Sequence, residues 1–78
     1  MNKGISKLAE GFEEWNSVLE NSDESSEEYA EAMEQMKDAM SDVLGTSEEF
    51  ISNDFITENL EDIEKAAKGD AEAIDRLR

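Results

Sequence analysis

Apolar residues near the start of the chain recur at spacings of three and four, which is the period of one face of an α-helix. The pattern predicts an amphipathic helix of about four turns over residues 5–19. Gly11 lies inside the pattern, and we expect it to allow another helix to pack closely. The stripe consists of Ile5, Leu8, Phe12, Trp15 and Leu19, and Val18 widens it.

A second run with the same spacing follows a polar segment, 21–26, whose short side chains favour a loop. We predict a helix over residues 26–44, with Ser25 as its N-cap and Glu28 completing a capping box. Gly45 stands where a left-handed residue commonly ends a helix. The apolar face of this helix consists of Tyr29, Met33, Met36, Met40, Val43 and Leu44.

The next segment echoes the start of the second helix, because Thr46 and Glu49 have the spacing of another capping box. Phe50 and Ile51 then form an apolar pair ahead of a polar triplet, 52–54. One interpretation is a single helical turn at 47–52 followed by a fresh helix from about residue 54. The other is one bent helix, and the polar triplet favours the first.

A third helical face begins at Phe55 or Ile56 and continues through Leu60, Ile63 and Ala67. No stretch of the chain alternates polar and apolar residues with the period of a half-buried strand. β-Branched residues are sparse, whereas residues of high helix propensity such as Ala, Glu, Lys, Met and Leu are plentiful. The chain is therefore predicted to be all-α.

Gly69 predicts the end of that helix, and Asp70 is a suitable N-cap for a last short helix. The apolar residues of the last helix are Ala73, Ile74 and Leu77. The predicted fold is a small helical bundle of three main helices plus one or two short helices. We expect residues 1–78 to form a single acidic helical domain, and the uncapped helical pattern at Arg78 suggests a piece of a longer protein.

The amino-acid composition excludes several kinds of catalytic and metal site. The 78 residues include 22 acidic and 7 basic side chains, with a net charge of −15 and no His, Cys or Pro. Without His and Cys, the chain cannot form a Ser-His-Asp or Cys-His site, a His-ligated zinc site or a disulfide. So short a chain also has few large apolar side chains to spare for the walls of a pocket. We therefore expect no enzyme and assign no catalytic, cofactor-binding or metal-binding residue.

The same composition bears on location and on partners. No run of large apolar residues or alanine exceeds two, so the sequence predicts neither a transmembrane helix nor the core of a signal peptide. We expect a cytoplasmic protein that is not secreted through a signal peptide. Direct binding to nucleic acid is not expected either, because it needs a basic face.

The charge is unevenly distributed along the chain. Residues 23–64 carry fifteen acidic side chains and a single basic one, Lys37, whereas 65–78 carry four basic and three acidic side chains. One interpretation is that the C-terminal segment docks on the acidic middle of the chain. The other is that its charges are solvated and stabilise the end of a helix.

Clustered carboxylates raise the question of calcium, which in an EF-hand needs Gly at position 6 and Glu at position 12 of the loop. A loop starting at Asp23 places Glu34 at position 12 but Glu28 at position 6, and one starting at Asn21 places Ala32 at position 12. Both registers fail. The alternatives that remain are a weak surface calcium site and, favoured, a solvated loop.

Three further features allow both a functional and a structural interpretation. Met33, Met36 and Met40 could form an adaptable groove for a partner, but their spacing favours the filling of a core. Trp15 and Tyr29 could be interface anchors, although their places on the apolar stripes again favour the core. The dense negative charge could imitate DNA and fill the basic site of a nucleic-acid enzyme, or could simply be a solvated face.

Four segments of the chain together resemble an internal stretch of a known family. Residues 12–19 read FEEWNSVL, 38–56 read DAMSDVLGTSEEFISNDFI, 59–70 read NLEDIEKAAKGD and 73–77 read AIDRL. In overall texture they are similar to the tail tape-measure proteins of phages and prophages of Firmicutes-type gut bacteria.

The resemblance implies a structural role, since that family sets tail length and helps DNA delivery, and it has no common catalytic residues to carry over. It places the chain in the bacterial host or the phage virion, with other parts of the parent protein or tail proteins as partners. The alternative is a stand-alone acidic helical binding protein, either an adaptor or a DNA mimic.

Overall fold

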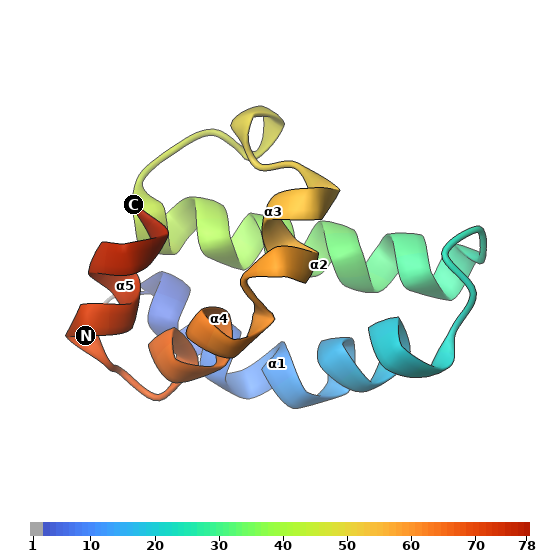
Figure 1. Cartoon of the computed structure of the whole chain (residues 1–78), viewed down its shortest axis with the longest axis horizontal. Coiled ribbons are helices and arrows are strands. Elements are labelled where there is room, and N and C mark those ends of the chain that lie inside the picture. The colour runs from blue at the N-terminus through green and yellow to red at the C-terminus, as the bar shows by residue number, and fades with distance from the viewer. Residues whose placement is uncertain (1–2) are drawn as a thin grey trace.

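Two long helices lie side by side and run in opposite directions: α1 (Lys3–Asn21) and α2 (Glu27–Leu44) (Figure 1). The computed structural model describes residues 3–78, so residues 1 and 2 of the predicted domain lie outside it. Each helix follows its stripe of apolar residues, which faces the other helix and the core. The predicted helices at 5–19 and 26–44 are confirmed. The polar loop between them is confirmed over 22–26, whereas Asn21 still belongs to α1.

The first turn of α1 passes very close to the last turn of α2. A Cβ atom placed on Gly4 would lie 2.5 Å from the backbone nitrogen of Val43 and 2.8 Å from the carbonyl carbon of Asp42. No side chain can be accommodated at that separation without a shift of one helix. Gly4 therefore sets how closely the two helices cross at this end of the hairpin.

The prediction that Gly11 allows another helix to approach is wrong. The space above Gly11 holds the indole of Trp15, whose Cζ2 atom would lie 2.3 Å from a Cβ at position 11. Helical side chains lean toward the N-terminus, so a large ring covers the residue four positions before it. In this position the Trp15 Nε1–H donates a hydrogen bond of 3.1 Å to Gln35 Oε1 on α2.

The N-terminus of α2 lies one residue later than the capping box predicts. Ser26, and not Ser25, is the N-cap, and its Oγ accepts a hydrogen bond of 3.2 Å from the Tyr29 N–H. Ser25 instead donates its N–H and its hydroxyl to Asp23 Oδ1, each at 2.9 Å. The predicted Ser25–Glu28 box is therefore wrong. Ser25 is part of a turn in which the Asp23 side chain accepts its hydrogen bonds, so Ser25 does not cap the helix.

Gly45 ends α2 in the left-handed conformation, with φ of 70°, as predicted. The second predicted box, Thr46 with Glu49, is wrong, because Thr46 belongs to the end of α2. Its N–H donates to the Ser41 carbonyl at 3.2 Å, and its carbonyl accepts from the Ser41 hydroxyl. Ser47 takes the N-cap position of the next turn and makes no side-chain cap hydrogen bond.

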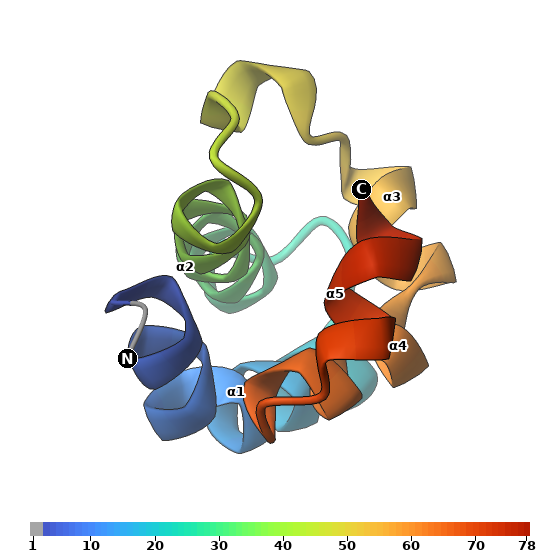
Figure 2. The same cartoon turned by 90° about the vertical axis from the view of Figure 1, so that its left-hand side faces the viewer.

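A single 3₁₀ turn, η1 (Glu48–Phe50), follows, and then a separate helix, α3 (Asn53–Glu58). The interpretation as one turn followed by a fresh helix is confirmed. The serine of the polar triplet starts α3, since Ser52 Oγ accepts a hydrogen bond of 3.0 Å from the Phe55 N–H. Figure 2 shows that this segment spans from the end of α2 across to α3.

The third helical face is divided between α3 and α4 (Leu60–Ala67), which meet at Asn59. Asn59 leaves helical geometry, with φ of −118° and ψ of 19°, and its Nδ2–H donates to the Phe55 carbonyl at 2.8 Å. That bond satisfies an end carbonyl of α3. The division allows α3 to pack on α2 while α4 packs on α1 (Figure 1).

The last helix, α5 (Ala71–Leu77), begins as predicted. Gly69 adopts a positive φ of 89°, and Asp70 Oδ1 accepts hydrogen bonds from the N–H groups of Glu72 at 2.9 Å and Ala73 at 3.4 Å. Helix α5 packs on α4 and also reaches α2. Residues 3–78 thus form a small all-α bundle, in which the described part of the chain contains no strand.

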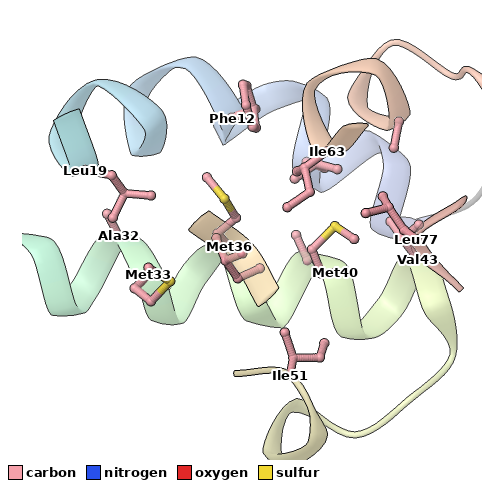
Figure 3. Close-up of a cluster of buried hydrophobic side chains, with 14 of the residues drawn as sticks. Phe12, Leu19, Ala32, Met33, Met36, Met40, Val43, Ile51, Ile63 and Leu77 are labelled. Carbon is pink, nitrogen blue, oxygen red and sulfur yellow. The ribbon is translucent and has the colours of Figure 1, made fainter. Parts of the chain in front are cut away.

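The core is built from apolar side chains of every α-helix and of the segment after η1 (Figure 3). The methionine stripe fills its centre, with Met36 and Met40 completely buried and Met33 3% exposed. Tyr29 is also buried, so for these four residues the interpretation as core is confirmed. Figure 3 places Phe12 and Ile51 on opposite sides of α2. The fully buried large side chains are Leu8, Met36, Met40, Ile56 and Ile63.

We expect replacement of Asp70 by alanine to lower the free energy of unfolding by about 0.5–2 kcal/mol, because two N–H groups of α5 lose their acceptor. The midpoint of urea unfolding, followed by circular dichroism, measures the change. Asp70→Asn keeps an oxygen acceptor at the same place and should behave nearly as the native chain. An asparagine variant as unstable as the alanine variant would contradict the capping role.

Candidate interaction surface

The charged side chains lie on the surface, since no charged or polar side chain is buried among the described residues. One group of carboxylates lies where η1 approaches α2. Four carboxylates, those of Glu31, Glu34, Asp38 and Glu48, line one hollow of about 260 Å³ together with Gln35. We call these four residues the acidic face. Three of them have the three-four spacing of one side of a helix, and the fourth comes from η1.

A carboxyl pair links the two elements of the acidic face. Hydrogen bonding to Asp38 raises the pKa of Glu48 above its usual value, and burial and the charges of Asp38 and Glu34 add to the rise. Hydrogen bonding to Lys7, followed by that to Glu48, lowers the pKa of Asp38. As the pH rises past the raised pKa of Glu48, a shared proton is replaced by repulsion between two carboxylates.

Lys7 is the cation at the edge of the acidic face. Its Nζ donates to Asp38 Oδ2 at 2.7 Å and to Asp42 Oδ2 at 3.3 Å, and so it ties α1 to α2. These hydrogen bonds, that to Asp38 first, raise the pKa of Lys7. All three side chains are about half exposed, so water and salt screen the pairs and their effect on stability is small.

The basic C-terminal segment fits both interpretations of its charge, since one residue docks on the acidic middle of the chain and others are solvated near the end of a helix. Arg76 docks on the acidic middle of the chain, where its Nε–H and Nη2–H donate to Asp62 Oδ1 at 3.1 and 3.0 Å and join α5 to α4. The lysines instead form exposed pairs with glutamates of α4, Lys65 from within the helix and Lys68 from the residue after its end. Lys65 lies 3.8 Å from Glu61, and the nitrogen of Lys68 lies 3.9 Å from Glu64.

A separate, mostly apolar groove is lined by residues from the C-terminal end of α2, from η1 and from α3 and α5. Its volume is about 430 Å³. Phe50 lies at this groove with 76% of its surface exposed, although it is a large apolar side chain. The lining residues are Leu44, Thr46, Phe50, Ile51, Phe55, Leu77 and Arg78, and we call this hollow the Phe50 groove.

The apolar pattern of the sequence does not predict the Phe50 groove, although it contains one signal of it. Two apolar pairs, 50–51 and 55–56, lie in very short elements. A single 3₁₀ turn cannot direct two adjacent side chains to the same core, so one member of the first pair must face outward. Ile51 is buried and Phe50 is the exposed member.

Trp15 occupies an intermediate position between core and surface. Its ring packs against the buried cluster while its N–H reaches Gln35 on the outside of α2. The polar tip is therefore satisfied and the apolar body is covered, the usual arrangement for a half-buried tryptophan.

In the Asp23 loop, the alternative to a weak calcium site is favoured, because the Asp23 carboxylate accepts hydrogen bonds from Ser25 within the loop. Bonds from the backbone N–H and then the hydroxyl of Ser25 lower the pKa of Asp23. Helix α2 begins at Glu27, so the residues that an EF-hand would use as a loop are already helical. Over residues 3–78 no group of three or more acidic side chains is arranged to hold a metal ion.

None of the helices in the described part of the chain combines the length and apolar character that crossing a membrane requires.

Comparisons with protein-family models, with curated proteins and with solved structures find no match to this chain. The acidic face and the Phe50 groove are therefore the main structural guides to function.

Repulsion among the carboxylates leads to a prediction about salt. The Debye length falls from about 30 Å at 0.01 M to about 10 Å at 0.1 M ionic strength, so salt screens charges across the whole domain. We expect a higher melting temperature at 0.5 M NaCl than at 10 mM NaCl, because the 22 acidic side chains far outnumber the 7 basic ones. A gain of 1 kcal/mol corresponds to about 4–8 °C in a domain of this size. A flat or falling melting temperature in calorimetry would show that nearby cations already compensate the carboxylates.

Proposed function

We propose that this chain is a non-catalytic helical interaction module and serves as a structural segment of a phage-like tail tape-measure protein. The observation that carries the proposal is the acidic face, where carboxylates from α2 and η1 gather in one hollow. Such a surface attracts a basic protein surface and repels a phosphate backbone. The partner is therefore a protein, either another part of the parent protein or a tail protein, and not a nucleic acid.

The resemblance of residues 12–19, 38–56, 59–70 and 73–77 to tape-measure proteins supports the structural part of the proposal. On this basis the module is present in the cytoplasm of the bacterial host or in the phage virion. An apolar, closely packed core with charges at the surface suits a module that works by contact.

The encoding locus provides the first test. A reading frame of many hundred codons around this segment, beside tail genes, is the expected result. A stop codon directly after the codon for Arg78 would contradict a tape-measure origin.

Tail length provides the second test. An in-frame deletion of the 78 residues from the parent gene is expected to shorten the tail, as measured by electron microscopy of virions. The shortening should lie between the 32 Å length of the folded domain and about 120 Å, the length of the same residues as one continuous helix. Tails of unchanged length would contradict a role in setting length. A deletion of equal size elsewhere in the parent gene is the matched control.

The charge spacing along α2 favours a second candidate, a stand-alone acidic binding protein that acts as an adaptor or DNA mimic. Six carboxylates lie between Glu27 and Asp42, which corresponds to about one per 4.5 Å of helix axis. One strand of DNA carries a charge every 3.4 Å, so the two spacings are similar.

Titration calorimetry with a purified basic nuclease or methyltransferase tests the second candidate. Binding at 10 mM NaCl that weakens steeply at 0.5 M NaCl is the expected result for a mimic. Absence of binding at the lower salt concentration would exclude it for that enzyme class.

A further inference from the structure

Phe50 is exposed on a hydrogen-bonded turn that fixes its backbone. The 3₁₀ turn that carries it is closed by two backbone hydrogen bonds of 3.0 Å, from the Phe50 N–H to the Ser47 carbonyl and from the Ile51 N–H to the Glu48 carbonyl. The next residue, Ile51, is 4% exposed and anchors the turn to the core. Phe50 is therefore presented to solvent by a fixed support, and it is the one exposed large apolar side chain in the described part of the chain.

The groove beside Phe50 has the size and lining of a site for a large apolar side chain. Its volume of about 430 Å³ lies within the range of roughly 300–1,000 Å³ typical of ligand pockets. Leu44, Phe55 and Leu77 contribute apolar walls from three different helices. Helices α3 and α5 both pack on α2, so the groove exists before any partner binds.

The charges around η1 define the chemistry of the partner. Glu34, Glu48 and Glu49 line a separate hollow of about 630 Å³ beside η1, where Lys37 is the one basic residue, and Arg78 is the one charged residue that lines the groove. A segment that crosses η1 would therefore contact apolar walls on one side and carboxylates on the other. A second copy of this chain is a poor occupant, because two molecules of charge −15 repel each other.

We propose that the Phe50 groove binds an apolar side chain of a basic polypeptide segment, whose Lys or Arg residues contact Glu48 and Glu49 across η1. This inference rests on the proposed function, for which it names the contact surface and the chemistry of the partner. Phe50 and the groove walls supply the apolar contact, and the carboxylates select positive charge and accelerate encounter.

The probe is a fluorescein-labelled 18-residue amphipathic helix of leucine and lysine, and its binding to the whole chain is followed by fluorescence anisotropy in 0.15 M NaCl. We expect Phe50→Ala to weaken binding by about tenfold, within the range for loss of an aromatic anchor. Glu48→Gln together with Glu49→Gln is expected to weaken binding and to reduce its dependence on salt. Amide shifts in NMR should change around Leu44 and Leu77.

Two controls separate groove binding from general attraction to an acidic protein. Glu20→Gln removes one exposed carboxylate on α1, away from the groove, and should change affinity less than twofold. A probe with serine in place of leucine keeps the charge and should lose its dependence on Phe50. Circular dichroism checks that Phe50→Ala stays folded, as expected for an exposed side chain.

Equal affinity of the native chain and Phe50→Ala would overturn the inference, as would amide shifts confined to α1. The tail-length test has a separate readout. Shortened tails combined with binding that ignores Phe50 would reject the groove and leave the structural role intact. Phe50-dependent binding combined with unchanged tails would reject the tape-measure role and leave the groove intact.

Discussion

Replacing Ile63 by alanine is expected to lower the free energy of unfolding by about 2–5 kcal/mol. The Ile63 side chain is completely buried on α4, the helix that packs against both α1 and α5. The substitution removes apolar contact and leaves a cavity that the surrounding helices can close only partly. Because a core of this size supplies only about 3–5 kcal/mol, the variant should be largely unfolded at 25 °C, as measured by circular dichroism and urea titration.

Ile63→Val keeps the fold measurable, with an expected cost of about 0.5–1.5 kcal/mol. Ile74→Ala is the matched control, because Ile74 lies at the edge of the core with part of its surface in water. Its cost should be clearly smaller than that of Ile63→Ala. Equal costs at the two positions would mean that α4 does not pack on the hairpin as described.

Gly4→Ala is expected to destabilise the domain by about 1–3 kcal/mol, the usual cost of overpacking. The sign is informative, since glycine to alanine in an exposed helix normally stabilises by about 1 kcal/mol. Here the new methyl group would lie 2.5 Å from the backbone nitrogen of Val43. Backbone cannot rotate away as a side chain can, so α1 and α2 must separate at this end.

Gly11→Ala provides the comparison, because the obstacle there is the side chain of Trp15. The indole would have to turn and lose its hydrogen bond to Gln35. Trp15→Leu removes the ring, so Gly11→Ala should cost much less stability when it is added to Trp15→Leu than when it is made in the native chain. A Gly4→Ala variant more stable than the native chain in urea would show that the helices are not in contact at that point.

The sequence predicted the helices well because their main signal is local. Apolar spacing of three and four placed α1 and α2, and the glycines at 45 and 69 marked helix ends that need a positive φ. The spacing of the methionine stripe indicates core for the same reason, and the stripe is buried in the structure. A helix that buries one face has apolar residues at helical spacing along that face, so the face can be identified from the sequence.

Helix starts were less predictable, since several polar residues compete for the same backbone groups. Residue type does not distinguish the predicted cap Ser25 from its neighbour Ser26, and the turn at Asp23 makes Ser26 the cap. The Thr46 N–H donates a hydrogen bond to the Ser41 carbonyl at the end of α2, so Thr46 does not cap the next turn. Asn59 divided the third helix, because α3 and α4 pack on different partners.

The sequence by itself determined the all-α class, the positions of the two long helices, most of the core and the concentration of negative charge between residues 23 and 64. Only the tertiary structure decided that Glu48 joins Asp38 on the acidic face, that Gly4 meets Val43, and that Phe50 stays outside beside a groove. The physical reason is distance along the chain. Helical periodicity depends on neighbours within four residues, whereas these contacts join elements that meet only after the helices have packed.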